Sequence, residues 1–135
     1  MGTQTAALMF GGQNDSLSPP KRGETEEYNG TGWSVEATCP SALGGIGSAG
    51  VGTQTAALAF AGNNLGPLFN NTESWDGSSW TEDNNLNTAR DYLGGAGTQT
   101  SALAFGGAPV PSRGTTTEEF TGETTAVNIT DFTTS

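Results

Sequence analysis

Carboxylates are the residues best suited to chemistry in this chain, because it has no histidine and a single cysteine. Two adjacent acidic pairs, Glu26-Glu27 and Glu118-Glu119, are where the acid and base of a glycosidase would be sought. Both pairs lie in a motif that predicts a strand, and adjacent residues of a strand point to opposite faces. Since Glu26, Glu73 and Glu118 recur at equivalent places, we interpret them as structural acceptors of backbone hydrogen bonds.

The remaining reactive side chains do not form a catalytic or metal-binding set. Without histidine, the Ser-His-Asp and Cys-His mechanisms and most zinc sites are excluded. Cys39 has no partner for an internal disulfide, and we predict a buried, unreactive thiol. Four aspartates lack the spacing of a calcium loop and are interpreted as turn-forming residues: Asp15, Asp76, Asp83 and Asp91. We therefore predict no catalytic residue, no metal and no cofactor.

Charge narrows the classes of partner. The 135 residues carry a net charge of −10 with only four Lys and Arg residues. Nucleic acid and anionic membrane surfaces both need clustered basic residues, so neither is an expected partner. No apolar run reaches the length of a membrane span, and we expect no secretory signal at the start of the sequence. Scarce Lys with abundant Asn, Thr and Gly is common in proteins that work outside cells or on virus particles.

The elements that position these residues follow from a repeat. The eleven-residue motif Gly-Thr-Gln-Thr-Ala-Ala-Leu-Met-Phe-Gly-Gly, which we call the phrase, starts at Gly2. It recurs at Gly52 and Gly97 with eight positions identical in all three copies. The spacings of about 50 and 45 residues fit a four-stranded propeller blade. We predict one domain, 1–135, made of three units, 1–51, 52–96 and 97–135.

Each unit contains a second motif, Thr-Glu-x-aromatic-x-Gly, at 25–30, 72–77 and 117–122. In the first two units a Trp follows, Trp33 and Trp80. The alternation of side chains predicts strands in the phrase, in the second motif and after each Trp, over 33–38 and 80–84. The Gly-rich segments 43–50 and 93–97 are interpreted as inner strands, where backbones crowd around an axis. No helix is predicted, because no stretch has a 3.6-residue apolar period.

The phrase has one bulky and one small apolar face. Leu8 and Phe10 share the first, and Ala7 and Met9 the second, with Ala replacing Met in the later copies. This predicts a strand that is covered on both sides. The aromatic residues that recur at equivalent places are interpreted as core: Tyr28, Trp75, Phe120, Trp33 and Trp80. Two aromatic residues that do not recur, Phe69 and Tyr92, are better candidates for contact surfaces.

Variable loops over 13–23, 63–71 and 108–114 follow the glycines that end the phrase, and we expect them on one side of the molecule. Loops commonly carry binding residues. The candidate contact residues in these loops are Ser18, Lys21, Arg22, Leu68, Phe69, Val110 and Arg113.

The order of these motifs resembles the Kelch repeat: an Ala- and Leu-rich strand, Phe-Gly-Gly, a variable loop, Glu-x-aromatic-x-Gly and then Trp. Arg90, before the third inner strand, is similar to the arginine of that repeat, and the second unit has none there. The resemblance implies an all-β fold of three four-stranded antiparallel sheets of the β-propeller type. The wording Gly-Thr-Gln-Thr-Ala-Ala-Leu-Ala-Phe also resembles Kelch-like proteins of bacteriophages and marine environmental sequences, which implies a virion or extracellular setting.

Three blades are too few to close a ring, since Kelch propellers usually have about six or seven. The end blades would expose apolar faces, so we expect a homo-oligomer, most simply two chains closing a six-bladed ring. A longer chain or an open array is the rival arrangement. The expected function is that of a non-enzymatic structural component of a virion or extracellular fibre, in contact with itself or with other virion or fibre proteins. The alternative is a free-standing module that binds a glycan or a protein through its loops.

Overall fold

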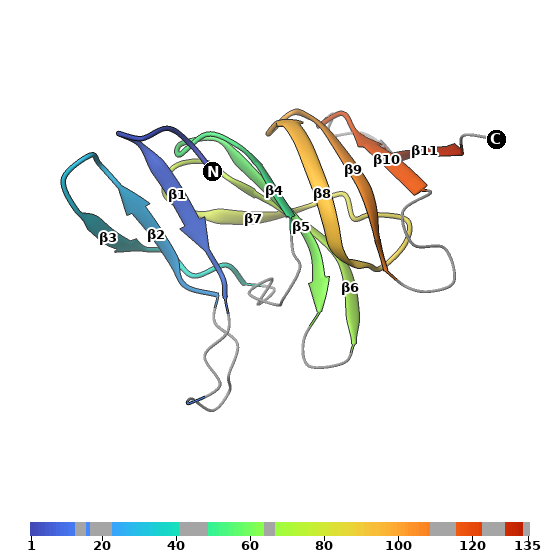
Figure 1. The fold of residues 1–135 in the computed structure, drawn as a ribbon, viewed down its shortest axis with the longest axis horizontal. Helices are drawn as coiled ribbons and strands as arrows, with labels where there is room; N and C mark the ends of the chain where they lie inside the picture. Colours follow the sequence, from blue (N-terminus) through green and yellow to red (C-terminus); the bar gives the residue numbers. More distant parts are fainter. Residues whose placement is uncertain are drawn as a thin grey trace.

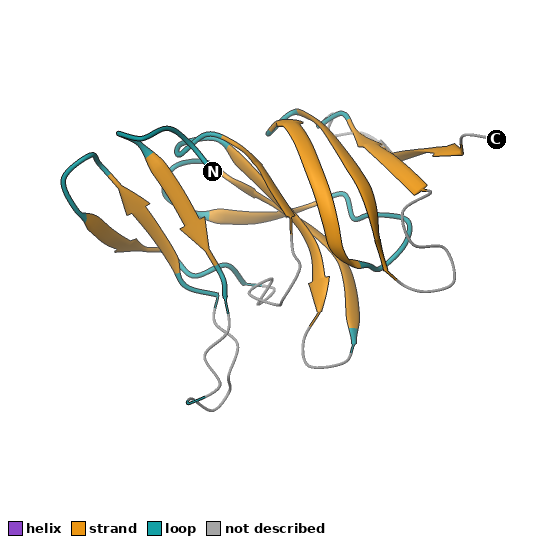
Figure 2. Ribbon diagram, in the orientation of Figure 1, coloured by secondary structure: helices purple, strands orange, loops and turns teal. Residues whose placement is uncertain are grey.

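The computed structural model of the chain describes residues 1–12, 16, 23–40, 49–63, 67–108 and 116–122, and the backbone of 129–133. Within these residues every regular element is a strand, and none is a helix (Figure 2). The prediction of an all-β chain is therefore confirmed for the described part.

The strands form three antiparallel sheets. The first sheet has the order β1 (Ala7–Phe10), β2 (Thr25–Tyr28) and β3 (Trp33–Glu36). The second has the order β4 (Ala49–Gly52), β5 (Ala57–Asn63), β6 (Leu68–Trp75) and β7 (Trp80–Asp83). The third consists, in sequence order, of β8 (Asp91–Thr98), β9 (Ser101–Ala108), β10 (Thr116–Phe120) and β11 (Ile129–Thr133).

The sheets follow one another in a row along the long axis of the molecule, with the second between the other two (Figure 1). The phrase supplies β1, β5 and β9, which end on the same side of that row (Figure 1). The strands predicted in the Gly-rich segments are present as β8, at the edge of the third sheet, and in part as β4; residues 43–48 lie outside the described part. The first sheet has three described strands, and Met1 accepts a 2.8 Å hydrogen bond from Leu8 N–H beside β1.

The glycines of β4 and β8 have a different cause from the predicted crowding of backbones around an axis. A Cβ on Gly95 in β8 would lie 2.7 Å from Cζ of Phe60, which belongs to the second sheet. A Cβ on the equivalent Gly50 in β4 would lie 2.9 Å from Cε1 of Phe10 of the first sheet and even closer to Cε of Met1. These positions therefore accommodate the phenyl ring of the preceding sheet rather than a crowd of backbones.

The loop predicted over 63–71 is shorter than expected. β5 runs to Asn63 and β6 starts at Leu68, and the two strands pair again beyond a bulge between Phe60 and Gly62. Ala61 lies in this bulge at a φ of 62°, in the left-handed region. Leu68 and Phe69 are thus strand residues, and the prediction that they lie in a loop is wrong.

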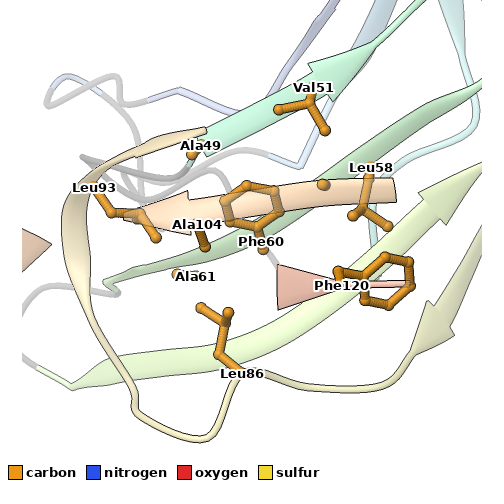
Figure 3. Close-up of a cluster of buried hydrophobic side chains, with 10 residues drawn as sticks. Ala49, Val51, Leu58, Phe60, Ala61, Leu86, Leu93, Ala104 and Phe120 are labelled. Atoms are coloured by element: carbon orange, nitrogen blue, oxygen red, sulfur yellow. The ribbon is translucent and has the colours of Figure 1, made fainter. Parts of the chain in front are cut away.

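Two apolar clusters lie between neighbouring sheets. The first joins Leu8 and Phe10 of β1, and Cys39, to Ala57, Trp75 and Trp80 of the second sheet. The second cluster joins the second and third sheets (Figure 3). Its members are Ala49, Val51, Leu58, Phe60, Ala61, Leu86, Leu93, Ala102, Ala104 and Phe120. The predicted burial of the thiol of Cys39 is confirmed.

Candidate functional site

Each sheet has two different faces, and the strand register defines them. In the second sheet Ala57 pairs with Trp75, which pairs with Trp80, so these three share one face. We call this the small face, and it includes the second alanine of the phrase and the motif glutamate. The opposite face carries the phrase Leu and Phe and the motif Thr, and we call it the bulky face. Neighbouring sheets meet bulky face to small face.

Trp80 anchors the contact between the first and second sheets. Its ring lies edge-on to Phe10, with centroids 5.2 Å apart. Its Nε1–H donates to Thr25 Oγ1 over 2.8 Å, and both groups are buried. One tryptophan of the small face thus binds both an aromatic ring and a hydroxyl of the bulky face.

The glutamine of the phrase ties each sheet to the one before it. Gln54 Nε2 donates to the carbonyl of Tyr28 over 3.2 Å and to Glu27 Oε2 over 3.3 Å, both in the first sheet. Gln99 Nε2 donates in the same way to the carbonyl of Trp75 over 2.6 Å. Sequence reasoning missed this role, although the identity of this glutamine in all three copies was the signal for it.

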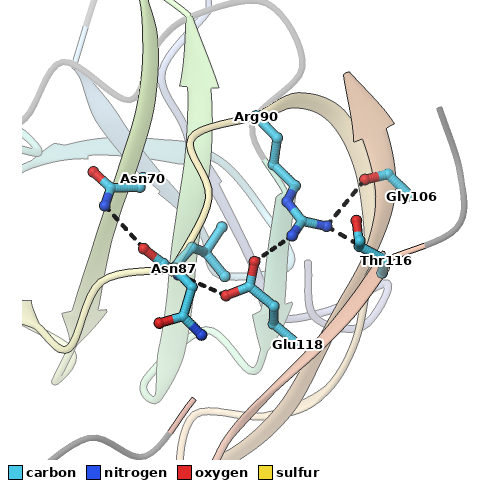
Figure 4. Close-up of polar contacts among 7 residues, drawn as sticks. Asn70, Asn87, Arg90, Gly106, Thr116 and Glu118 are labelled. Atoms are coloured by element: carbon cyan, nitrogen blue, oxygen red, sulfur yellow. Dashed lines mark hydrogen bonds and ion pairs between the residues drawn. The ribbon is translucent and has the colours of Figure 1, made fainter. Parts of the chain in front are cut away.

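The motif glutamate of the third sheet, Glu118, binds the segment that connects β7 of the second sheet to β8 (Figure 4). Glu118 Oε2 accepts a 2.6 Å hydrogen bond from the backbone N–H of Asn87, and Oε1 pairs with Arg90 Nη2. Both side chains of this ion pair are buried, and Arg90 Nη1 also donates to the carbonyls of Gly106 and Thr116. The predicted structural role of the glutamate is thus confirmed for Glu118, which lies on the opposite face from Glu119.

Arg90 joins the two sheets through its backbone as well. Its N–H donates to Phe69 O over 3.1 Å, and its carbonyl accepts from Gly62 N over 2.8 Å. Both of these partners belong to the second sheet. Arg90 therefore holds the second sheet with its main chain and the third with its guanidinium group.

Cys39 plays the corresponding part in the second sheet. Its Sγ lies 3.0 Å from Oε2 of the fully buried Glu73, to which the thiol donates. The next residue, Pro40, takes the place of Asn87 and has no N–H to offer. The thiol thus provides a hydrogen bond to the glutamate at a place where the backbone cannot.

The two end sheets each leave one face uncovered by another sheet in the described part of the chain. On the small face of the first sheet, Trp33 is 55% exposed, whereas its equivalent Trp80 is 8% exposed. On the bulky face of the third, Phe105 is 42% exposed, whereas its equivalent Phe60 is 2% exposed. Met9 and Leu103 are exposed as well. The expected exposure of apolar end faces is confirmed, and the prediction that Trp33 is a core residue is wrong.

The predicted contact residues are not gathered into a site by the described structure. Leu68 and Phe69 are half-buried at the start of β6. The other five lie outside the described residues: Ser18, Lys21, Arg22, Val110 and Arg113. Tyr92 is 64% exposed and has a φ of 52°, which is unusual for a residue other than glycine.

The aspartates differ in their roles. Asp76 forms the predicted turn, where its carboxylate accepts hydrogen bonds from Ser79 and Ser78. The backbone N–H groups of Ser79 and Ser78, and then their hydroxyls, lower its pKa to about 2. Asp91 is instead buried in β8 and accepts a 2.6 Å hydrogen bond from Asn63, so its prediction as a turn residue is wrong. Asp15 lies outside the described residues.

Among the described residues, no group of three or more Cys, Asp or Glu side chains is placed to hold a metal ion. No helix in that part of the chain has the length and apolar character of a membrane span.

No protein-family model matches the chain, and no curated protein matches it either. The uncovered end faces are therefore the best candidate for a functional surface.

Proposed function

We propose that this chain is a non-enzymatic structural component of a larger assembly, and that its sheets are propeller-type blades similar to Kelch repeats. The observation that carries the proposal is the pair of uncovered faces, on which Trp33 and Phe105 are exposed while their equivalents inside the row are buried. A contiguous apolar surface on a protein generally marks an interaction site. A virion tail, fibre or decoration protein, or an extracellular fibre, is the setting we propose.

The burial of these faces supplies the driving force. Each large apolar side chain that becomes fully buried contributes about 1.5–3 kcal/mol, and the end faces carry several of them. Two chains, each providing three sheets, would complete a six-bladed ring, and an open array would bury the same faces.

The placement of the carboxylates supports the non-enzymatic part of the proposal. Glu73 and Glu118 are buried and accept hydrogen bonds within the chain. Asp91 is buried and accepts one from Asn63. Each of these carboxylates therefore has a structural partner within the chain.

Molar mass in solution tests the proposal. Size-exclusion chromatography with light scattering, run from low to high protein concentration, is expected to show a multiple of the 13.7 kDa chain mass. Electron micrographs of the assembled material would then distinguish rings from fibres. A mass of one chain at every concentration would refute assembly between copies.

Recognition of a glycan or a protein through the strand ends is a second candidate function, and Tyr92 is the observation that favours it. An exposed aromatic ring held on a strained backbone is a feature that functional sites share. A glycan array probed with the wild type and with Tyr92→Ala tests this candidate. Retained binding by the variant, or no binding by the wild type, would count against it.

A further inference from the structure

The uncovered bulky face and the uncovered small face are the two halves of a contact that the chain already makes twice. The first sheet presents its bulky face to the second sheet, and the second presents its bulky face to the third. The third sheet is left with a bulky face that carries Leu103 and Phe105, and the first with a small face that carries Trp33. We propose that the third sheet of one copy docks on the first sheet of a second copy, in the same order and orientation as neighbouring sheets within the chain. This inference rests on the proposed function and specifies its partner.

Trp33 is the anchor of this contact. Within the chain, Trp80 packs against Phe10 and donates to Thr25. The equivalents of those two partners on the bulky face of the third sheet are Phe105 and Thr117. Phe105 is exposed and Thr117 is half-buried, so both are accessible to the indole of a second copy. Trp33 then packs its ring on Phe105 and donates its Nε1–H to the hydroxyl of Thr117.

Gln4 provides an independent second pairing. Gln54 and Gln99 are half-buried because they reach the preceding sheet, whereas Gln4 is exposed. The equivalents of the acceptors of Gln54 are Glu119 and the carbonyl of Phe120. An open hollow of about 370 Å³ lies beside Glu119 and is lined by Ala96, Gly97, Ser101, Ala102, Leu103 and Glu119. The amide of Gln4 from a second copy enters this hollow and donates to the two acceptors.

This contact joins two different surfaces, so it has a direction. A head-to-tail contact of this kind closes into a ring if the rotation between copies allows it, and otherwise continues as a filament. A contact between two identical faces, small to small or bulky to bulky, would instead give a symmetric dimer in which the other end face of each chain stays uncovered. A test that detects direction therefore separates the proposal from unspecific apolar association.

Two charged substitutions test the direction, because each one removes one half of the contact. In the Trp33→Glu variant only the bulky face of the third sheet can still dock on a second copy. In the Phe105→Glu variant only the small face of the first sheet can. Each variant alone is expected to be monomeric by light scattering and to keep the β-sheet circular dichroism of the wild type. Mixed in equal amounts, the two are expected to form a heterodimer, since one competent face of each kind is then present.

Val35→Glu is the matched control. Val35 is even more exposed than Trp33 and lies two residues further along β3. Its equivalent in the second sheet is Glu82, which stays exposed beside the internal contact. The control variant is therefore expected to assemble like the wild type. Gln4→Ala is expected to raise the dissociation constant of the assembly by about tenfold without abolishing assembly.

The outcomes separate this inference from the proposed function. If the wild type assembles and either Trp33→Glu or Phe105→Glu still assembles alone, the head-to-tail pairing is overturned and assembly itself stands. A mixture that remains monomeric, or a Val35→Glu variant that loses assembly, also overturns the pairing. A wild type that is monomeric at every concentration overturns the pairing and all assembly between copies, and is the result expected if another protein covers these faces.

Discussion

Removing one partner of the Arg90–Glu118 pair is expected to destabilise the chain more than any other single polar change among its described residues. Both side chains are almost completely buried, at 2% and 0% exposure. Arg90→Met leaves a buried carboxylate that keeps the hydrogen bond from the N–H of Asn87 but has lost its counter-charge, and it also removes the donor to Gly106 O and Thr116 O. Breaking a buried ion pair in this way costs about 3–5 kcal/mol in free energy of unfolding.

The double variant shows whether the cost comes from the isolated charge. Glu118→Leu alone leaves the guanidinium buried without its counter-charge, and it also costs about 3–5 kcal/mol. Arg90→Met combined with Glu118→Leu removes both charges, and the main residual penalty is the loss of the hydrogen bond from the N–H of Asn87 to the carboxylate, about 1–3 kcal/mol. The double variant should therefore be more stable than either single variant, with a coupling energy of at least about 2 kcal/mol.

Urea unfolding followed by tryptophan fluorescence measures these free energies, at one fixed protein concentration because assembly adds to apparent stability. Glu82→Gln is the matched control, since Glu82 is an exposed glutamate in the neighbouring sheet and should change stability by less than about 0.5 kcal/mol. A loss below about 1 kcal/mol in Arg90→Met, or strictly additive losses in the double variant, would contradict the role assigned to this pair.

Three further predictions concern the contacts between sheets and a turn. Gly95→Ala places a Cβ 2.7 Å from Phe60 and is expected to cost about 1–3 kcal/mol by urea unfolding, whereas Gly32→Ala, where a Cβ meets nothing within 4 Å, should be close to neutral. Trp80→Phe removes the buried hydrogen bond to Thr25 and should cost about 1–3 kcal/mol in the same assay. The lowered pKa of Asp76, about 2 against 3.8, means that its stabilising contribution is present above pH 3.8 and is lost as the pH falls towards 2; a carboxyl titration followed by NMR with a midpoint near 3.8 would contradict this.

The strands were predictable because the sequence pattern of each strand occurs in more than one unit of the repeat. The alternation of bulky and small side chains in a single copy of the phrase is weak evidence for a strand. The same alternation recurs from Ala7, Ala57 and Ala102, and a strand is the one assignment that fits all three copies. Every predicted strand that falls in the described residues is present, with ends that differ by a few residues. Strand β11 was missed because its unit lacks the Trp that marks the equivalent strand in the others.

The errors arose where burial depends on a neighbour that the repeat does not contain. Trp33 has the same place in its sheet as Trp80, and its exposure differs because the second sheet has a sheet before it and the first has none in the described structure. Phe69 was assigned to a loop because it lies in the variable segment that follows the last glycine of the phrase, yet β6 pairs with β5 through Gly62 and Asn63 beyond the bulge. The pairing of Asp91 with Asn63 joins the third sheet to the second across 28 positions of the chain and leaves no mark in the local sequence.

The identity of the three phrases is itself an argument for assembly. Leu58 and Phe60 are large because the third sheet covers them, and Gln54 is polar because it donates to the first sheet. Inside this chain no described sheet covers Phe105 in that way, and Gln4 is exposed. A row that ended at these residues would be more soluble with polar side chains at Leu103 and Phe105, and it would need no glutamine at position 4. The presence of the contact residues at both ends is what a row of sheets requires when each end meets the opposite end of another copy.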